Sequence, residues 1–334
     1  MTTGTQYIEL AEQVDAELRQ VMASRTMPLY DMMAYHLGWG EQPGVTDSRD
    51  LADRNHGVLC VVSCMAVGGG VDEALPAAAA VELVHKFCQI HDDVQGGKPK
   101  RGDRDAVWWV WGPAQAINAG DGMHALARLA LFRLLDRSVS AKTAFRAVQV
   151  LDEAGLRTCE GRFLDLQAQE RIDTSTSSYL QMAADKEGAL YACAMQLGAL
   201  VAGGSEACIE ALKQSGVDLG VAMLIRSDIA ELSASNTASE EVMNKKKMLP
   251  VVSAFESASA SQRRQLGDIY FKRVLEPSDL PKLLEVLEDV GAIESSRELL
   301  DQHVLSARTA LESAGLSSEG QKLLTESLES LVEP

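Results

Sequence analysis

The sequence predicts an all-α protein, and three observations lead to this prediction. Apolar residues make up 46% of the 334 residues and recur over long stretches at helical spacing. The chain contains only 9 prolines, and aromatic residues make up 5%, so residues that break helices or favour strands are scarce. A chain of this length can bury a large core. We therefore expect one domain, residues 1–334, with a motif-bearing core at about 20–260 and peripheral helices at about 261–334.

Local signals divide the chain into helices. Pro28 suits the first turn of a second helix, the run Gly68-Gly69-Gly70 ends the third, and Gly203-Gly204 ends a later one. The polar segment 232–244 is expected to be a loop, and the helices after it are shorter and amphipathic. We expect helices at about residues 7–21, 28–36, 50–67, 72–93, 105–135, 141–173, 179–202, 205–231, 250–258, 261–275, 280–290, 293–314 and 317–332.

Charge and cysteine content restrict the class of protein. A formal net charge of −17 disfavours binding to nucleic acid or to an anionic membrane surface. The N-terminus lacks an apolar signal core, and no run of 18 consecutive apolar residues provides a membrane anchor. The six cysteines form no Cys-x-x-Cys pair and lie mostly in apolar runs, as expected in a reducing compartment. We expect a cytoplasmic protein.

Two acidic clusters each close a long apolar helix. Asp92-Asp93 follows the run that begins at Ala80, and Asp228 and Glu231 are spaced to lie on one helix face. Carboxylates at the end of a buried helix are costly to desolvate unless a cation meets them, which indicates Mg²⁺. The alternative at Asp92-Asp93 is a solvated helix terminus, and all four residues could instead form surface salt bridges.

Basic residues lie near both acidic clusters. Arg101 follows the first cluster, Lys186 lies within an apolar helix, and the run Lys245–Lys247 follows the second. Mg²⁺ ions held by two acidic faces, together with these cations, would clamp a diphosphate and neutralise the charge that develops as its bond to carbon breaks.

These blocks together resemble the trans-isoprenyl diphosphate synthases, also called polyprenyl synthetases. The resemblance runs from about residue 25 to residue 250 and implies an all-α isoprenoid synthase-type bundle around a central apolar cavity, Mg²⁺ as cofactor, an allylic prenyl diphosphate as substrate and a homodimer. The blocks that carry it, in chain order, are Glu82–Asp93, Gly112–Asp121, Glu160–Asp165, Asp185–Tyr191, Gly220–Glu231 and Lys246–Pro250.

The resemblance implies a role for individual residues. The catalytic and Mg²⁺-binding carboxylates would be Asp92, Asp93, Asp228 and Glu231, and the diphosphate would be bound by Arg101, Lys186 and Lys246. The apolar cavity wall would include Phe87, Cys88, Met223, Leu224 and Tyr191. A phenylalanine at the cavity floor suggests a prenyl chain of about fifteen to twenty carbons.

The two metal motifs depart from the family pattern Asp-Asp-x-x-Asp. The first reads Asp92-Asp93-Val94-Gln95-Gly96, so its last carboxylate is missing. The second reads Ser227-Asp228-Ile229-Ala230-Glu231, so its leading carboxylate is missing, and Leu224 replaces an upstream glutamine. Metal binding through these motifs would involve fewer ligands than in a standard synthase.

The site for the second substrate, isopentenyl diphosphate, departs further. Where the family has Lys, Arg and a second Arg, this chain has Ser24, Met27 and Gly102, and Asp103 adds a negative charge. His85 is retained. Each lost charge-assisted hydrogen bond is worth about 1.5–3 kcal/mol, so three losses would weaken binding by several orders of magnitude.

The sequence alone therefore favours a Mg²⁺-dependent class I terpene synthase that ionises one allylic diphosphate and releases a cyclised or quenched terpene. Three alternatives remain open. The chain could be a prenyltransferase with an uncharged acceptor such as an aromatic ring, a chain-elongating synthase that uses isopentenyl diphosphate, or a non-catalytic partner subunit of a synthase.

Overall fold

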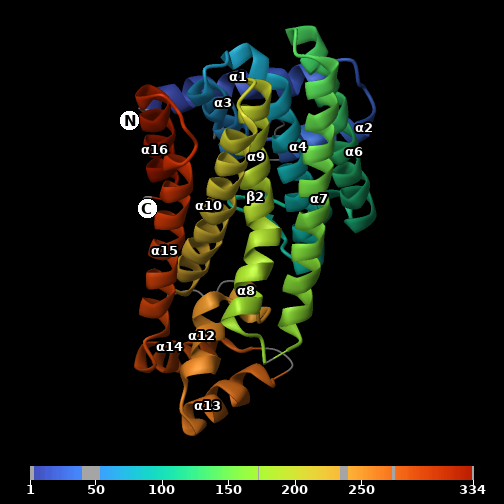
Figure 1. The fold of residues 1–334 in the computed structure, drawn as a ribbon. Coiled ribbons are helices and arrows are strands. Elements are labelled where there is room, and N and C mark those ends of the chain that lie inside the picture. The colour runs from blue at the N-terminus through green and yellow to red at the C-terminus, as the bar shows by residue number, and fades with distance from the viewer. Residues whose placement is uncertain (1–3, 40–52, 172, 234–239, 273–274, 333–334) are drawn as a thin grey trace.

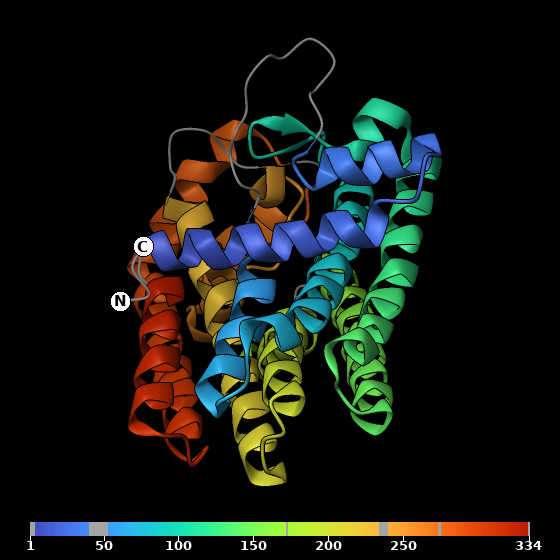
Figure 2. The same ribbon diagram turned by 90° about the horizontal axis from the view of Figure 1, so that it is seen from above.

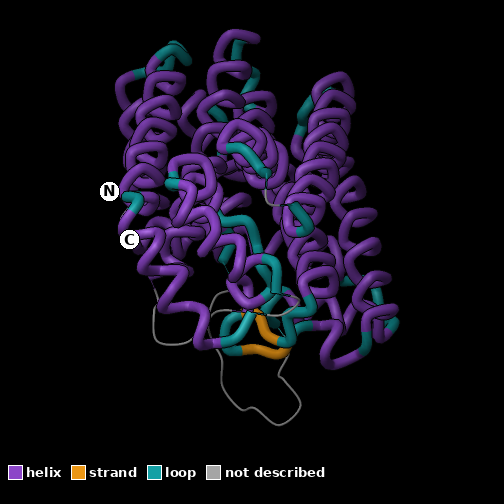
Figure 3. Tube along the Cα trace, turned by 90° about the horizontal axis from the view of Figure 1, so that it is seen from below, coloured by secondary structure: helices purple, strands orange, loops and turns teal. Residues whose placement is uncertain are grey.

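The computed structural model describes residues 4–39, 53–171, 173–233, 240–272 and 275–332 (Figure 1). The all-α prediction is confirmed, because helices form nearly all of the described chain and the strands in it are confined to one short hairpin (Figure 3). In those residues no helix is long and apolar enough to cross a membrane.

The first half of the chain contains the centre of the bundle. Its elements are α1 (Gly4–Met22), α2 (Pro28–His36), α3 (Asn55–Val67), α4 (Val71–Gly96), β1 (Lys100–Arg101), β2 (Arg104–Asp105), α5 (Val107–Trp111), α6 (Pro113–Phe132), η1 (Arg133–Arg137) and α7 (Ala141–Gln169). The helix predicted from residue 50 begins at Asn55, and residues 50–52 lie outside the described chain.

The second half completes the bundle and adds the C-terminal helices. Its elements are α8 (Thr176–Ala183), η2 (Ala184–Gly188), α9 (Ala189–Val201), α10 (Glu206–Ser233), α11 (Glu240–Met243), α12 (Leu249–Ser257), α13 (Ala260–Tyr270), η3 (Pro277–Asp279), α14 (Leu280–Asp289), α15 (Ala292–Glu312) and α16 (Ser318–Val332). The short helix α11 lies in the segment expected to be a loop.

Helix α4 lies at the centre because its first half is made of small apolar residues. The side chains of Ala77–Val81 are fully buried, so neighbouring helices approach it closely. It packs against α3, α6 and α9, and α1 crosses this end of the bundle at a large angle to the long helices (Figure 2). The apolar half of α4 thus fixes the position of its polar C-terminal end.

Helix α9 packs backbone to backbone against α3 at Gly198. A β-carbon at this position would lie 2.3 Å from the carbonyl oxygen of Cys60 and 2.8 Å from the amide nitrogen of Cys64. Glycine is therefore required for the observed helix spacing. This contact joins α9 to the same core that surrounds α4.

The C-terminal helices continue the bundle on the side of α10. Helix α15 packs along α10, and α16 packs against α3 (Figure 1). Leu311 and Leu324 belong to the same buried apolar cluster as α4. Helices α12 to α14 form a second apolar cluster, which includes Leu266 and Leu287, at the other end of α10.

Three local features differ from the helix pattern that the sequence predicts. The helix expected at 105–135 is divided at Gly112, whose φ of 84° is unfavourable for other residues, and Pro113 begins α6. A π-helical turn, η2, separates α8 from α9. The expected loop after α4 contains the antiparallel β1–β2 hairpin, with Gly102 at its turn at φ 58°.

Candidate functional site

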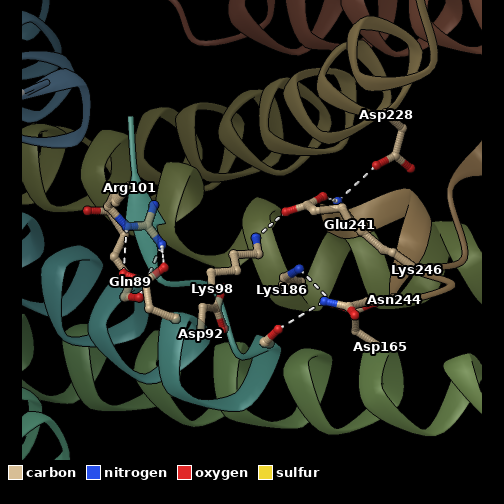
Figure 4. A network of polar contacts seen from close by, with 12 residues as sticks. Gln89, Asp92, Lys98, Arg101, Asp165, Lys186, Asp228, Glu241, Asn244 and Lys246 are labelled. Atoms are coloured by element: carbon tan, nitrogen blue, oxygen red, sulfur yellow. Dashed lines mark hydrogen bonds and ion pairs between the residues drawn. The ribbon is translucent and has the colours of Figure 1, made fainter. Parts of the chain in front are cut away.

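A cavity of about 790 Å³ lies between the C-terminal end of α4, the facing stretch of α7, the η2 turn, α10 and the segment 241–246. Its apolar lining includes Phe87, Cys88, Phe163, Leu166, Leu190 and Leu224. Its charged lining consists of four carboxylates, Asp92, Asp165, Glu187 and Glu241, and five cations, Lys98, Arg101, Arg162, Lys186 and Lys246. The cavity is therefore amphiphilic, and Figure 4 shows how many of its charged side chains point toward one another.

The end of α4 determines where the first acidic cluster lies. Gly97 adopts the left-handed conformation at φ 63°, and the amide of Lys98 turns back to donate to the carbonyl of Asp93 at 2.9 Å. This turn directs Lys98 to the opposite side of the cavity, where its ammonium group pairs with Glu241. Asp92 stays on the cavity side of α4.

Arg162 of α7 connects the first acidic cluster to a second carboxylate. Its Nε lies 2.8 Å from Oδ1 of Asp92, and its Nη1 lies 2.9 Å from Oδ2 of Asp165. The same Asp165 oxygen accepts a hydrogen bond from Nζ of Lys186 at 2.7 Å. Burial would raise the pKa of Asp165, but Lys186 and Arg162 outweigh it and lower the pKa. Asp165 is thus an anion shared by two cations.

The η2 turn places Lys186 in the cavity. Insertion of a π-helical turn shifts the side-chain direction relative to an α-helix, and such turns are frequent at functional sites. At Gly161 of α7, a β-carbon would lie 2.3 Å from the amide nitrogen of Lys186, so α7 and η2 approach this closely only with glycine. Burial would lower the pKa of Lys186, but Asp165 and Asp92 outweigh it and raise the pKa.

Asp93 points away from Asp92 and anchors Arg101. The buried carboxylate of Asp93 accepts hydrogen bonds from Nε of Arg101 at 3.0 Å and from Nη2 at 2.7 Å. Nη2 also donates to the carbonyl of Gln89 at 3.1 Å. Burial raises the pKa of Asp93, although Arg101 opposes this rise. Both oxygens of Asp93 are therefore used to orient a cation that lines the cavity.

Asp228 has a corresponding anchoring position on α10. Its carboxylate is fully buried and accepts hydrogen bonds from the Tyr179 hydroxyl at 2.7 Å and from the Leu249 amide at 2.9 Å. Its other oxygen lies 3.1 Å from Nζ of Lys246. Asp228 thus holds the segment before α12 and directs Lys246 toward the cavity.

Glu241 faces the cavity between two lysines. Nζ of Lys246 donates to its Oε2 at 2.6 Å, and Lys98 pairs with Oε1. Burial would raise the pKa of Glu241, but the two ammonium groups outweigh it and lower the pKa from 4.5 to about 2. Asn244 donates to the carbonyl of Gly96 at 3.1 Å and closes the same side of the cavity.

The structure brings together most of the cavity residues that the sequence predicts, but not the predicted metal ligands. Arg101, Lys186, Lys246, Phe87, Cys88 and Leu224 line the cavity. Tyr191 is instead buried, with its ring centre 4.4 Å from that of His56, and Met223 packs on the main core. Among the predicted metal ligands, Asp92 lines the cavity, whereas Asp93, Asp228 and Glu231 do not.

The four carboxylates that the sequence predicts as Mg²⁺ ligands do not converge on one open site, because only Asp92 lines the cavity. Asp93 and Asp228 are buried behind the cavity surface in bonds to the protein, and Asp92 pairs with Arg162. In the described part of the chain, no group of three or more His, Cys, Asp or Glu side chains is arranged to hold a metal ion.

Four functional candidates were not assigned a role from the sequence: Lys98, Arg162, Asp165 and Glu241. Lys98 lies in a loop and Glu241 lies in the polar segment 232–244, and nothing in their immediate sequence distinguishes them from solvated charges. Arg162 and Asp165 lie in the block Glu160–Asp165, which carries the family resemblance but does not by itself indicate their roles. Only the fold places them around one cavity.

The residues that the sequence places at a second diphosphate site lie as follows. Met27 is 64% exposed, and Gly102 lies at the hairpin turn. His85 lines the cavity, and its Nε2 lies 2.9 Å from Nε2 of Gln89. Lys86 is buried behind this pair, where it donates to Oε1 of Gln89 at 3.2 Å and lies 3.5 Å from a carboxylate oxygen of the buried Glu82.

Comparisons with known proteins agree with this architecture. The profile of the Polyprenyl synthetase family matches residues 52–287. A geranylgeranyl diphosphate synthase of Mycobacterium tuberculosis is 32% identical over 302 residues, which cover 89% of this chain and 85% of that protein. A short chain isoprenyl diphosphate synthase of Methanothermobacter thermautotrophicus is 32% identical over 76% of this chain and 78% of its own length. The crystal structure of a polyprenyl synthetase from Streptomyces coelicolor superposes with a TM-score of 0.88 at 27% identity and covers 97% of this chain and 98% of that one.

The depressed pKa of Glu241 predicts a specific pH dependence of stability. Its carboxylate stabilises the fold above its unfolded pKa of 4.5, and this contribution is lost as the pH falls toward about 2. We expect Glu241→Gln to lower the free energy of unfolding by about 1–3 kcal/mol at pH 7, measured by urea denaturation. The difference from the wild type should shrink below about pH 4.5.

Glu210→Gln is the matched control, because Glu210 is an exposed glutamate of α10 that pairs with Lys213 at the surface. It should change stability by less than about 0.5 kcal/mol. A Glu241→Gln effect that stays constant from pH 7 to pH 3 would show that the ion pairs of Glu241 do not cause it.

Proposed function

Because this chain belongs to the polyprenyl synthetase family, a family of prenyltransferases, we propose that it joins an allylic prenyl diphosphate to isopentenyl diphosphate and releases diphosphate. The observation that carries the proposal is the amphiphilic cavity, which has five cations and four carboxylates at its charged surface and several aromatic and aliphatic side chains elsewhere in its lining. This combination suits a ligand with an anionic head and a long apolar chain. The similar proteins are named as synthases of such compounds.

The charged surface of the cavity would bind the diphosphate and stabilise it as a leaving group. Arg101, Lys186 and Lys246 come from three different elements and are held in place by buried carboxylates. Their side chains therefore need little reordering when an anion binds. As the carbon–oxygen bond of the allylic diphosphate breaks, its electron pair leaves with the diphosphate, and fixed cations nearby stabilise the added charge.

The apolar part of the cavity would hold the prenyl chain and exclude water from the allylic cation. Phe87 packs against His124, with ring centres 5.0 Å apart, and both Phe87 and Leu190 line the cavity. Phe87 lies five residues before Asp92, more than one helical turn deeper in the bundle. This position supports a limited chain length, and we propose products of about fifteen to twenty carbons.

A second function, formation of a terpene from a single prenyl diphosphate, is favoured by one observation. The residues where a second diphosphate would be held include Ser24, Met27 and Gly102, none of which can pair with a phosphate through a cationic side chain. The sequence alone favours this function, but the similar proteins favour prenyl transfer. Lys86 lies beside Gln89 in this region, but the buried Glu82 already pairs with it at 3.5 Å.

A product assay separates the two functions. We expect the purified protein to consume allylic diphosphates of several chain lengths only when isopentenyl diphosphate is present, and to give longer prenyl diphosphates, identified by mass spectrometry. Lys186→Gln should lower kcat/KM by about 10- to 100-fold, because one charge-assisted hydrogen bond to the leaving group is lost. Lys213→Gln, at the exposed surface of α10, should leave it unchanged.

Hydrocarbon or alcohol products without isopentenyl diphosphate would contradict chain elongation and favour the terpene synthase. In that case, Ser24→Lys together with Met27→Arg should introduce elongation. If the wild type already elongates through Lys86 and His85, the same double substitution should change its rate by less than about threefold.

We also propose that the chain forms a homodimer through α6 and α7. Large apolar side chains are exposed along these adjacent helices, including Leu129 and Phe132 on α6 and Phe145 and Leu156 on α7. Phe145 is 79% exposed. Such a cluster of exposed large apolar side chains is unusual on the surface of a monomeric protein. Helical spacing places Phe145 and Leu156 on one face of α7.

Light scattering after gel filtration tests the dimer. The wild type should have twice the 36.0 kDa mass of one chain. Phe145→Glu together with Leu156→Glu should give the mass of a single chain, because buried carboxylates would face an apolar surface. Phe271→Glu, at an equally exposed phenylalanine of the C-terminal part, should remain dimeric. A wild type that is monomeric at micromolar concentration would contradict the proposal.

A further inference from the structure

The carboxylates that could hold metal ions at this cavity already have cations of the protein between them. On one side, Arg162 lies between Asp92 and Asp165. On the other side, Lys246 lies between Asp228 and Glu241. A divalent cation that bridged either pair would have to displace a guanidinium or ammonium group from the same position.

Arg162 is held firmly in its bridging position. Its side chain is 14% exposed, and its Nε, besides pairing with Asp92, lies 2.9 Å from Oε1 of Gln95, one turn further along α4. Guanidinium remains charged at all accessible pH values and presents its donors in a fixed planar fork. Three side chains from two helices therefore converge on this one cation.

The missing carboxylates of the two acidic motifs are consistent with a protein cation, rather than a metal ion, between Asp92 and Asp165. Gly96 and Ser227 supply no carboxylate, which leaves Asp92 as the single carboxylate of the first motif on the cavity surface. A cluster of divalent cations needs several oxygen ligands from the protein or substrate. With fewer carboxylates and an added guanidinium, less negative charge remains at the cavity for a metal ion to neutralise.

We propose that Arg162 takes the place of a bridging divalent cation, so that the diphosphate of the substrate binds directly to guanidinium and ammonium groups without a metal ion between Asp92 and Asp165. This inference rests on the proposed function, because it assumes that the cavity binds a prenyl diphosphate. Arg162 would turn part of its fork toward the phosphate oxygens, and Lys186 would continue to neutralise Asp165.

Isothermal titration calorimetry with and without metal tests the proposal. The probe is a thiolodiphosphate analogue of a fifteen-carbon allylic diphosphate, whose carbon–sulfur bond resists cleavage. It is titrated into the protein once in buffer with EDTA and once in buffer with excess Mg²⁺. For the wild type, we expect the two Kd values to agree within about threefold. For Arg162→Gln, the Kd in EDTA should rise by about 10- to 100-fold, and Mg²⁺ should restore most of the loss, because Asp92 loses its cationic partner and Asp165 keeps only Lys186.

Arg146→Gln is the matched control. Arg146 lies on the same helix and pairs with a carboxylate, Glu206, but this pair is exposed and lies outside the cavity. Its Kd should match the wild type in both buffers. Thermal unfolding of each variant verifies that it is folded.

The outcomes separate this inference from the proposed function. If the wild type binds the analogue tightly only when Mg²⁺ is present, the inference is wrong, but the proposed function still stands. An Arg162→Gln protein that binds normally in EDTA also overturns it, as does an equal loss in Arg146→Gln. A folded wild type that binds the analogue under neither condition overturns both the inference and the proposed function.

Discussion

Pairing between buried carboxylates and cations from other elements holds the centre of this structure together. Asp93, Asp165 and Asp228 are almost completely buried on α4, α7 and α10. A carboxylate so far from water is tolerated only when cations and hydrogen-bond donors surround it. Arg101, Lys186 and Lys246 supply the cations, and each comes from a different segment of the chain.

The same pairs produce the properties of the cavity. Each buried carboxylate orients a cation whose other side is on the cavity surface, so an incoming anion meets side chains that are already in place. Packing supports this arrangement, because the alanine-rich half of α4 and the glycine contact between α7 and η2 leave little freedom for the helices to shift. We therefore expect stability and the binding of an anion to depend on the same ion pairs.

Composition and apolar spacing suffice to predict the all-α fold, because both act within each helix. The sequence blocks also place Arg101, Lys186 and Lys246 near one another. They do not distinguish a carboxylate that faces the cavity from one that supports it: Asp92 and Asp93 are neighbours in sequence, yet on a helix they point in different directions.

The remaining site residues depend on long-range geometry. Glu241 is one of many acidic residues in a polar segment, and it becomes distinctive only when Lys98, more than 140 positions earlier in the chain, lies beside it. Arg162 likewise acquires its role from Asp92 on another helix. The π-helical turn that carries Lys186 is not predicted from the sequence, and it packs closely against Gly161 of α7.

We expect these carboxylate-supported cations to bind the diphosphate of a prenyl substrate at one end of the amphiphilic cavity. A crystal structure of the protein with a prenyl thiolodiphosphate analogue tests it most directly. We expect diphosphate oxygens within hydrogen-bond distance of Arg101, Lys186 and Lys246, and the prenyl chain against Phe87 and Leu190. An analogue bound outside this cavity, or one whose diphosphate touches none of the three cations, would contradict it.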